Sequence, residues 1–527
     1  MRALLLGNVN LAPIAGEFRE LEVELGGYDD WLPQLLAPGS AAHSAEIEVV
    51  VVHLDGDEFF GRGGDVEELI AAAGAFRERN PSKLLVLNSF CTSPEDPATY
   101  AAPGEPGSRL SLERAANAKL LAFAKQHPGV LLLDLELLYR RFGADALVSD
   151  AFWYLGRVRY TKRMLRELAR HLEQLLRGAL DRGRKLLVLD LDGTLWGGVL
   201  GEDGASGIAL SEDGKGKVFR DLQKSLKALR EAGVLLAIAS KNNPDEVEAV
   251  FREHPMMVLS LADFAAVRVG WGAKDESLRE IAAELSLGLD ALVFLDDSPA
   301  ERELVRRALP EVAVPEPPGR IEALPRWLLR EVVYPFFPRW RTTAEDRARP
   351  AHYQARRERE SAQSSLTHAG FLESLAIRID FSLDPREHVE RASQMTQRTN
   401  QFNVTTRRYT VPELRAIIGN SSHRTLLLSY EDRFGKEGIV GLAIVALKTA
   451  EIDTLLLSCR VIGRGIEVAL VAAAEAAARA HGVRRLSARF VPTGRNAPAA
   501  DVFERCGYAL VRSDADGTRH YAKELGA

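Results

Sequence analysis

Short apolar runs alternate with stretches of helical periodicity from the start of the chain to about residue 310. Apolar runs of this kind are typical of strands buried on both faces, as in parallel sheets that are covered by helices on each side. In the first part of the chain the runs are 3–7, 47–55, 83–90 and 130–138, and the helical stretches are 65–79, 109–126 and 158–182. We therefore predict a doubly wound, three-layer α/β/α domain over residues 1–182.

The same alternation begins again at residue 183. Strands are predicted at 185–192, 234–240 and 291–297, and helices at 215–231, from Pro244 onward and at 274–286. A Pro-rich segment at 314–320 follows, so we predict a second three-layer α/β/α domain over residues 183–335. The charged run after it indicates a linker helix over residues 336–370.

The last region has a different order of elements. Apolar segments at 375–383, 424–432, 439–448 and 451–460 all precede one helix at 465–480. Consecutive strands ahead of a helix favour an antiparallel sheet. We predict an α+β domain over residues 371–527.

The composition narrows the classes of partner. The 527 residues carry a net charge of −6, so the chain has no overall positive field for nucleic acid. The three cysteines lie far apart and lack the spacing of a zinc site or a disulfide framework. No apolar run reaches the roughly 20 residues that span a membrane. We expect a cytoplasmic protein that binds neither nucleic acid nor membrane.

Two aspartates stand at the end of the first strand of the second domain. Asp190 and Asp192 are two residues apart, and the carboxyl edge of an open parallel sheet is where ligands bind. This spacing suits phosphoryl transfer, in which Asp190 attacks phosphorus and Asp192 donates and recovers a proton.

A second acidic pair, Asp296 and Asp297, ends another strand of this domain. Several carboxylates at one sheet edge repel one another unless a hard cation joins them, so we predict Mg²⁺ held by Asp190, Asp192, Asp296 and Asp297. Ser240 and Lys274 stand at the end of one strand and the start of one helix, where they can bind the oxygens of the transferred phosphoryl group.

These four elements resemble the motifs of the haloacid dehalogenase (HAD) superfamily. The resemblance implies an aspartyl-phosphate intermediate at Asp190. The 47 residues between Asp192 and Ser240 leave little room for a large cap domain, so we expect an open site.

A longer resemblance extends from residue 183 to the end of the chain. The segments that carry it are 189–204, 240–257, 294–306, 394–410 and 458–467. They resemble the FkbH-like family, HAD proteins of bacterial polyketide pathways. The resemblance implies that the enzyme takes a glyceryl unit from 1,3-bisphosphoglycerate, removes phosphate and delivers a glyceryl thioester to an acyl carrier protein. It also assigns Thr194, Lys241 and Asn242 to substrate binding.

A glycine-containing loop in the third domain follows a strand and opens a helix. Its residues Arg460, Gly463, Arg464 and Gly465 resemble the acyl-CoA loop of GNAT acyltransferases, and backbone N–H groups there can bind a pyrophosphate or the phosphate of phosphopantetheine. Without the resemblance, a tight helix entry explains the glycines equally well.

Two further features of this domain have alternative interpretations. Cys459 precedes the loop, where the helix N-terminus and arginines favour a thiolate that can accept an acyl group; core packing is the other reading. The polar cluster 400–408, with Asn403 in it, is either a loop that contacts the acyl group or carrier, or a solvated turn.

The first domain resembles the SGNH esterases in layout but not in chemistry. Gly7-Asn8 ends the first strand, Asn88 ends the third, and Asp150 precedes Trp153. No serine follows Asn8, and a tryptophan stands where the histidine is expected, so the nucleophile and base are absent. We predict a degenerate SGNH-like domain, with a generic flavodoxin-like sheet as the alternative.

Two other functions stay open at this point. One is a stand-alone phosphatase of small metabolites whose flanking domains bind partners. The other is a CoA-dependent N-acyltransferase fused to a HAD domain, for which Glu437 and Glu467 are the candidate bases.

Overall fold

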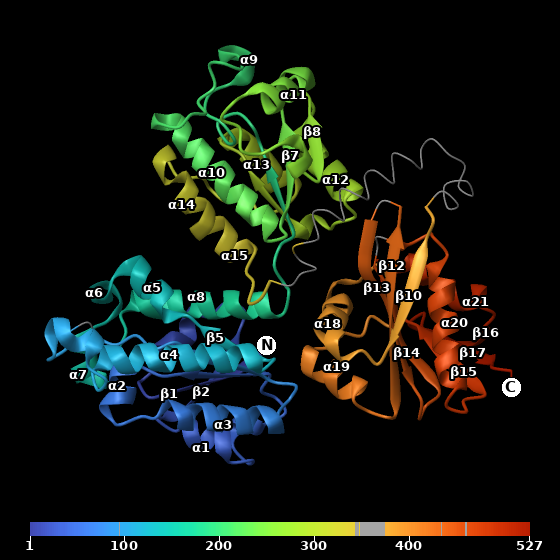
Figure 1. Cartoon of the computed structure of the whole chain (residues 1–527), viewed down its shortest axis with the longest axis horizontal. Helices are drawn as coiled ribbons and strands as arrows, with labels where there is room; N and C mark the ends of the chain where they lie inside the picture. Colours follow the sequence, from blue (N-terminus) through green and yellow to red (C-terminus); the bar gives the residue numbers. More distant parts are fainter. Residues whose placement is uncertain (94, 343–346, 348–374, 434, 459–460, 527) are drawn as a thin grey trace. The chain divides into compact units, whose positions relative to one another are not determined.

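The structure is a computed structural model of the whole chain, and it describes residues 1–93, 95–342, 347, 375–433, 435–458 and 461–526 (Figure 1). The chain divides into two compact units, residues 1–180 with 409–416 and residues 181–408 with 417–527. The predicted linker helix over 336–370 falls mostly outside the described residues, and the domain limits around it stay predictions.

A five-stranded parallel sheet forms the centre of the first unit, in the order β2-β1-β3-β4-β5. Its strands are β1 (Arg2–Gly7), β2 (Glu22–Tyr28), β3 (Val49–His53), β4 (Leu84–Asn88) and β5 (Val130–Leu133). Helix α8 (Lys162–Ala179) lies on the opposite side of the strands from α1 (Trp31–Leu36) and α3 (Val66–Arg79) (Figure 1). The predicted doubly wound α/β fold is confirmed for this unit.

Two elements of this sheet differ from the prediction. The strand expected over 130–138 ends at Leu133, and α5 (Leu135–Phe142) begins directly after it. Leu135 and Leu138 are buried, and their spacing of three is helical, so the apolar run contains a strand and a helix. Strand β2 was missed because it lies at the sheet edge, where half-exposed polar residues break the apolar pattern.

The second α/β sheet has four parallel strands in the order β8-β7-β6-β9. They are β6 (Leu186–Leu189), β7 (Leu235–Ser240), β8 (Ala266–Val269) and β9 (Leu292–Leu295). Alternate residues of β6 face opposite sides, so Leu187 and Leu189 belong to one core and Leu186 and Val188 to another. This sheet is therefore also buried on both faces, as its continuous apolar runs predict.

Helices on the two faces of this sheet complete the two cores. One core contains buried residues of α10 (Gly214–Glu231), α11 (Pro244–Glu253) and α14 (Leu324–Trp327). The other contains residues of α12 (Lys274–Glu284) and α13 (Pro299–Ala308). Figure 1 shows α10 and α14 on one side of the domain and α12 on the other.

The third region has a mainly antiparallel sheet in the order β10-β12-β13-β14-β15-β17-β16, with β11 paired to β14. The bounds are β10 (Arg378–Leu383), β11 (Phe402–Asn403), β12 (His423–Asp432), β13 (Gly435–Ala446), β14 (Glu451–Leu457), β15 (Arg485–Phe490), β16 (Ala509–Ser513) and β17 (Arg519–Glu524). Only the β14–β15 pair is parallel among the pairs of this sheet in the described chain. The α+β prediction is confirmed.

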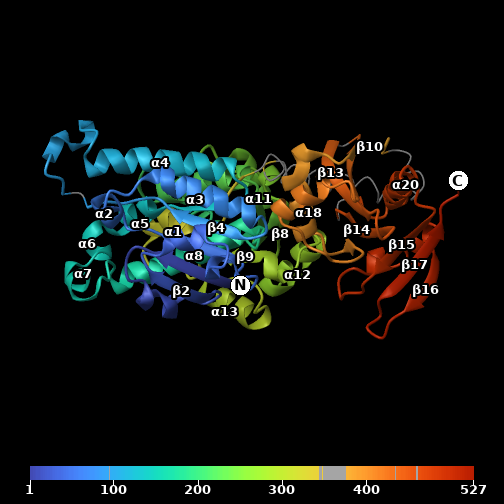
Figure 2. The same cartoon turned by 90° about the horizontal axis from the view of Figure 1, so that it is seen from below.

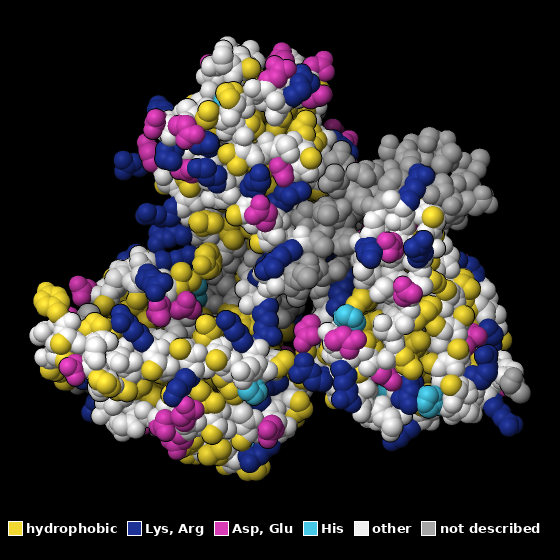
Figure 3. All heavy atoms as spheres, viewed as in Figure 1, with side chains coloured by type: hydrophobic (Ala, Val, Ile, Leu, Met, Phe, Trp, Pro, Cys, Tyr) yellow, Lys and Arg dark blue, Asp and Glu magenta, His cyan; other side chains and the backbone are white. Residues whose placement is uncertain are grey.

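Helix α20 (Ile466–Arg479) packs its apolar face on this sheet (Figure 2). Basic and acidic side chains are interspersed on the molecular face shown in Figure 3, as expected from a small net charge. Among the described residues, no helix combines the length and the apolar character needed to cross a bilayer.

Candidate active site

The carboxyl edge of the four-stranded sheet brings four predicted site residues together. Asp190 directly follows β6, and its backbone N–H donates to the carbonyl of Leu295 on β9 at 2.9 Å. Asp296 follows β9, Ser240 ends β7, and Lys274 begins α12. All four side chains come from the ends of neighbouring parallel elements, which is the geometry that predicted the site.

Lys274 is the positive centre of this site. Its ammonium nitrogen lies 2.7 Å from Asp190 Oδ1 and 3.0 Å from Asp296 Oδ2, and it donates to the carbonyl of Ala239 at 2.8 Å. The Lys274 side chain is only 3% exposed, so the interaction takes place away from bulk water. A buried ammonium that touches two carboxylates holds them in fixed positions and offsets part of their charge.

Burial raises the pKa of Asp190 above its ordinary value, Lys274 opposes this shift, and Asp296 adds to it. The Ser240 hydroxyl favours the ionised form of Asp190 and so lowers its pKa. Burial also raises the pKa of Asp296 and of Asp297. The site therefore holds more negative charge than its single ammonium can balance.

Three carboxylates of the site fit a divalent cation. Asp190, Asp296 and Asp297 each offer one oxygen, and these oxygens all lie within 4.8 Å of one another. Two of the three carboxylates are buried, and Asp297 is exposed at the edge. Hard cations such as Mg²⁺ prefer oxygen ligands of this kind, so the donor set agrees with the predicted metal.

Asp192 lies outside that group of carboxylates, although the sequence analysis predicted it as a metal ligand. Its Oδ1 accepts hydrogen bonds from the Trp196 indole (2.8 Å) and the backbone N–H of Leu200 (3.1 Å). Its Oδ2 accepts from the Asn242 amide at 3.0 Å. Three donors thus orient the Asp192 carboxylate beside Asp190, which suits proton transfer better than metal binding.

Asn242 connects two predicted site residues, because its amide also donates to the Ser240 hydroxyl at 3.2 Å. Trp196 was not predicted as a site residue. It is fully buried, and its only signal in the sequence is its place four residues after Asp192.

Gly193 permits the close approach of two strand-end loops. Its φ is +64°, and a Cβ at this position would lie 2.2 Å from Asp297 Oδ2. A side chain would therefore strain the backbone and displace a carboxylate of the proposed cation site. Thr194 is buried on the same turn, where its backbone N–H donates to the carbonyl of Leu191 at 3.1 Å.

Lys241 follows Ser240 on the loop after β7. Its ammonium contacts Glu301 Oε1 at 2.6 Å, and Glu301 lies in the first turn of α13. Glu301 was not predicted, and it ties this lysine to the helix that follows Asp297. The substrate-binding role of Lys241 stays a prediction.

The glycine loop of the third region has the backbone expected from its sequence. Gly463 and Gly465 have φ of +81° and +74°, and Gly465 caps the start of α20. The Arg464 guanidinium lies 3.5 Å from Asp432 Oδ2 and 5.0 Å from the centre of the Tyr430 ring. The loop thus uses Arg464 in an internal ion pair. Cys459 and Arg460 lie outside the described residues, so their predicted roles stay predictions.

Asn403 is buried in β11, and its amide serves the local backbone. The Asn403 side chain donates to the carbonyl of Thr399 at 3.3 Å and accepts from the N–H of Thr406 at 2.9 Å. These bonds are those of a turn-forming residue.

The two candidate bases of this region, Glu467 and Glu437, are both buried. Glu467 accepts a hydrogen bond from Arg505 at 2.9 Å, and Glu437 is fully buried.

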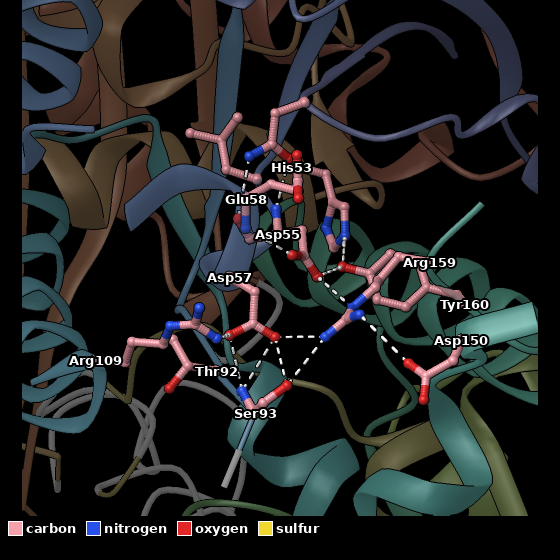
Figure 4. A network of polar contacts seen from close by, with 12 residues as sticks. His53, Asp55, Asp57, Glu58, Thr92, Ser93, Arg109, Asp150, Arg159 and Tyr160 are labelled. Atoms are coloured by element: carbon pink, nitrogen blue, oxygen red, sulfur yellow. Dashed lines mark hydrogen bonds and ion pairs between the residues drawn. The ribbon is translucent and has the colours of Figure 1, made fainter. Parts of the chain in front are cut away.

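The carboxyl edge of the first sheet carries a different polar network (Figure 4). The Asn8 and Asn88 side chains both bind backbone after β3: Asn8 Oδ1 accepts from the N–H of Asp55 (2.7 Å), and Asn88 Oδ1 accepts from the N–H of Leu54 (2.7 Å). Both asparagines therefore fix a loop. Trp153, in the place of the SGNH histidine, is buried with the Arg157 guanidinium 4.8 Å from its ring centre.

Asp57 and Arg159 form the centre of this network (Figure 4). Asp57 accepts hydrogen bonds from Arg159, from the Ser93 hydroxyl (2.6 Å) and from the Ser93 N–H (3.0 Å), and Arg109 lies 3.2 Å from it. Arg159 also lies 3.6 Å from Asp55 Oδ2. The serine of this network, Ser93, is thus hydrogen-bonded to Asp57 and Arg159. The degenerate SGNH-like assignment stays a prediction.

Buried titratable groups continue the network toward β3. The His53 ring nitrogen lies 2.9 Å from the Tyr160 hydroxyl, which donates to Asp55 Oδ2 at 3.4 Å. Burial raises the pKa of Asp55 to about 6 and lowers the pKa of His53 to about 4. This cluster was not predicted, because its members are isolated polar residues: His53 ends β3, Asp55 follows it, and Tyr160 is more than 100 residues further along the chain.

Comparisons with known proteins agree with two of the three regions. Residues 391–508 match the model of the Acetyltransferase (GNAT) family. A 139-residue stretch is 32% identical to enolase-phosphatase E1 of Streptomyces avermitilis, and it covers 26% of this chain. The chain spans about half the length of this curated relative, 55%.

A solved structure shares the fold over a longer part of the chain. It is the N-terminal part of a Bacteroides fragilis protein that contains a phosphatase domain and was crystallised with Mg. The likeness has a TM-score of 0.58 at 24% identity, and covers 62% of this chain and 92% of that chain. The chain thus combines a HAD phosphatase-like domain with a GNAT acetyltransferase-like domain.

Proposed function

We propose that the chain is a bifunctional phosphatase and glyceryl transferase of the FkbH type, which loads a glyceryl unit onto an acyl carrier protein. The observation that carries the proposal is the set of Asp190, Lys274 and Asp296 at an open sheet edge, in one chain with a GNAT-like domain. The sequence segments that resemble FkbH-like proteins occur in both of these domains.

In the phosphatase step, an Asp190 carboxylate oxygen attacks phosphorus, and the bond from phosphorus to the substrate oxygen breaks. Asp192 donates a proton to that leaving oxygen. A water molecule then gives a proton back to Asp192 and attacks the aspartyl phosphate, which releases phosphate and restores Asp190. Lys274 and Ser240 bind the phosphoryl oxygens as negative charge moves between them.

Asp190, Asp296 and Asp297 are the residues that would hold Mg²⁺. The presence of Mg in the Bacteroides fragilis structure supports the choice of cation. A bound Mg²⁺ supplies charge neutralisation at the phosphoryl group.

For the transfer step, 1,3-bisphosphoglycerate supplies an activated acyl phosphate. Either Cys459 or the GNAT-like cleft would carry the glyceryl group to the thiol of the carrier's phosphopantetheine arm. A new thioester forms while the acyl-phosphate bond breaks, so no oxidant or further energy source is needed. Gly463 and Gly465 give the loop a backbone that can approach a phosphate closely.

Intact-mass measurement of a carrier protein tests this proposal. The full chain, Mg²⁺ and 1,3-bisphosphoglycerate should add the mass of a glyceryl group to a holo carrier and add nothing to the apo carrier. The Asp190→Asn variant should leave either a phosphoglyceryl adduct or no adduct, and this result identifies which phosphate Asp190 attacks. No mass change across several carriers would remove the transferase proposal.

A phosphatase of small metabolites is the second candidate, and the similarity to enolase-phosphatase E1 favours it. It predicts Mg²⁺-dependent phosphate release that is unaffected by a carrier. The GNAT match supports a third candidate, a CoA-dependent N-acyltransferase, which predicts acetyl-CoA turnover with an amine. Against it, Glu467 is engaged by Arg505, which weakens it as a general base.

A further inference from the structure

Trp271 is a large apolar side chain that the fold leaves in solvent. It is 73% exposed and lies on the loop between β8 and α12, three residues before Lys274. Aromatic side chains usually contribute to stability by burial of about 150–250 Å² each. Trp271 is mostly exposed, so its burial contributes little to the stability of the domain.

A hydrogen bond nevertheless links Trp271 to a loop of the active site. Its indole N–H donates to Asn243 Oδ1 at 3.2 Å, and the Asn243 amide donates to Glu246 Oε1 at 3.1 Å. The backbone N–H of Gly270 donates to the carbonyl of Ser240 at 3.0 Å. The ring is thus attached to the Ser240–Asn243 loop, whose residue Asn242 orients Asp192.

The glycines on either side of Trp271 have no steric function in the fold. Neither Gly270 nor Gly272 has a positive φ, and a Cβ on either would meet no described heavy atom within 4 Å. Backbone geometry and packing therefore accept a side chain at both positions. Because neither glycine has a side chain, neither neighbour of Trp271 can cover the indole ring.

The segment that follows Asp192, between β6 and α10, forms a short flap. The chain between β6 and α10 contains one four-residue helix, α9 (Leu200–Asp203), and Val199 next to it is 43% exposed. A molecule whose phosphate is bound at Asp190 would therefore have room for its remaining part outside the carboxylate cluster, and Trp271 is an exposed ring on a loop of this site.

The charged groups near Trp271 favour substrates that have no second anionic group. Helix α11 begins with Asp245 and Glu246, and α12 begins with Asp275 and Glu276. Lys241, the nearest cation of the Ser240 loop, is paired with Glu301. A second anionic group on the substrate would meet these carboxylates and be repelled.

We propose that Trp271 is a specificity residue, a platform for the uncharged, extended organic chain that carries the phosphorylated acyl group. Such a chain is the amide-rich arm of a pantetheine thioester. The inference rests on the proposed function, and it predicts that the phosphate is removed after the acyl group has reached the arm.

Fluorine NMR of the full chain labelled with 5-fluorotryptophan tests the contact directly. The chain has six tryptophans, and the Trp271→Phe variant identifies the Trp271 signal. In the Asp190→Asn background, the 3-phosphoglyceryl thioester of pantetheine should shift this signal, whereas inorganic phosphate should not. A Trp271 signal that stays in place at all thioester concentrations overturns the inference, whether or not the carrier experiment succeeds.

Turnover gives the second readout. For the thioester, Trp271→Ala should lower kcat/KM about tenfold through KM, since one aromatic contact contributes about that factor. Trp271→Phe should keep most of the activity. Glycerol 3-phosphate, which has neither the arm nor a second anionic group, should be hydrolysed equally by all three proteins. Tyr154→Ala, which removes an 86% exposed ring in the first unit, is the matched control. Equal losses on both substrates contradict the inference, and wild-type inactivity toward both contradicts the proposed function alone.

Discussion

The two parallel sheets of this chain collect polar groups at the same edge but balance their charges differently. In the four-stranded sheet, Asp190, Asp296 and Asp297 face one ammonium, that of Lys274. In the five-stranded sheet, Asp57 alone contacts two guanidiniums and a serine. In both sheets the topology determines where polar groups meet. The charge that remains unbalanced determines whether a cation and a phosphate can be bound there.

The largest effect is expected at the unbalanced edge. Asp190→Asn should reduce phosphate release at least about 10³-fold, because the nucleophile is lost. The fold should be retained, since asparagine has the same shape and Lys274 keeps Asp296 and the Ala239 carbonyl. Phosphate release and thermal unfolding measure the two properties. Asp221→Asn, which changes an exposed carboxylate on α10, is the control, and an active Asp190→Asn protein would contradict the assignment.

At the balanced edge we expect a loss of stability without a loss of activity. Arg159→Met leaves Asp55 and Asp57 without their buried partner and should destabilise the first unit by about 3–5 kcal/mol. Arg109 is 45% exposed, so Arg109→Met should cost less than about 1 kcal/mol. Hydrogen exchange of β3 and β4 amides in the full chain reports both. If Arg159→Met reduced phosphate release more than about twofold, the prediction that this edge contributes to stability and not to activity would be wrong.

The stability of the first unit should depend on pH through two buried groups, Asp55 and His53. The raised pKa of Asp55, about 6 against 3.8, stabilises the fold at low pH, and this contribution is lost as pH rises to about 6. The lowered pKa of His53, about 4 against 6.5, stabilises the fold at neutral pH, and this contribution is lost as pH falls to about 4. Each is of the order of 3 kcal/mol, and between pH 4 and 6 the two slopes oppose each other.

The Asp55→Asn variant lacks the Asp55 contribution to the pH dependence of stability, and the His53 contribution remains. Protection of β3 amides from exchange should then decrease by about 3 kcal/mol between pH 6.5 and pH 4, whereas the wild-type protein should change little. Of the groups that act on Asp55, Arg159 and Tyr160 keep their charge over this range, and the carboxylates of Asp57 and Glu58 are present in both proteins. Parallel profiles for the two proteins would show that His53 and Asp55 do not offset each other.

The smallest expected effect is at Gly193. Gly193→Ala introduces a Cβ against Asp297 at a positive φ and should destabilise the domain by about 1–2 kcal/mol. Gly201→Ala on the flap, where a Cβ meets no described atom within 4 Å, should be nearly neutral. Thermal unfolding measures both. Phosphate release should fall only in Gly193→Ala, and equal behaviour of the two variants would contradict the steric account.

The sequence predicted the central fold well because strand ends are local features. Asp190, Ser240, Lys274 and Asp296 each follow or begin an element whose apolar pattern is clear, so a parallel sheet brings them to one edge. The orientation of Asp192 could not be predicted, because it depends on donors from the flap and the β7 loop.

The edge of the first sheet was not predictable in the same way. Arg159 and Asp57 are 102 residues apart, and neither belongs to a recognisable pattern. Strand β2 and the helix after Leu133 were also missed, since one is polar at the sheet edge and the other continues an apolar run. Such contacts become visible only when the loops are placed in space.

The hydrogen bond from the Trp196 indole to Asp192 links the folding of the flap to the orientation of the Asp192 carboxylate. Trp196 is fully buried, so the flap must acquire its core before Asp192, the proposed acid, is held in the orientation described above. Folding of the flap and orientation of Asp192, the proposed proton donor, would then occur together. A chain whose flap is still open would bind phosphate but transfer it slowly.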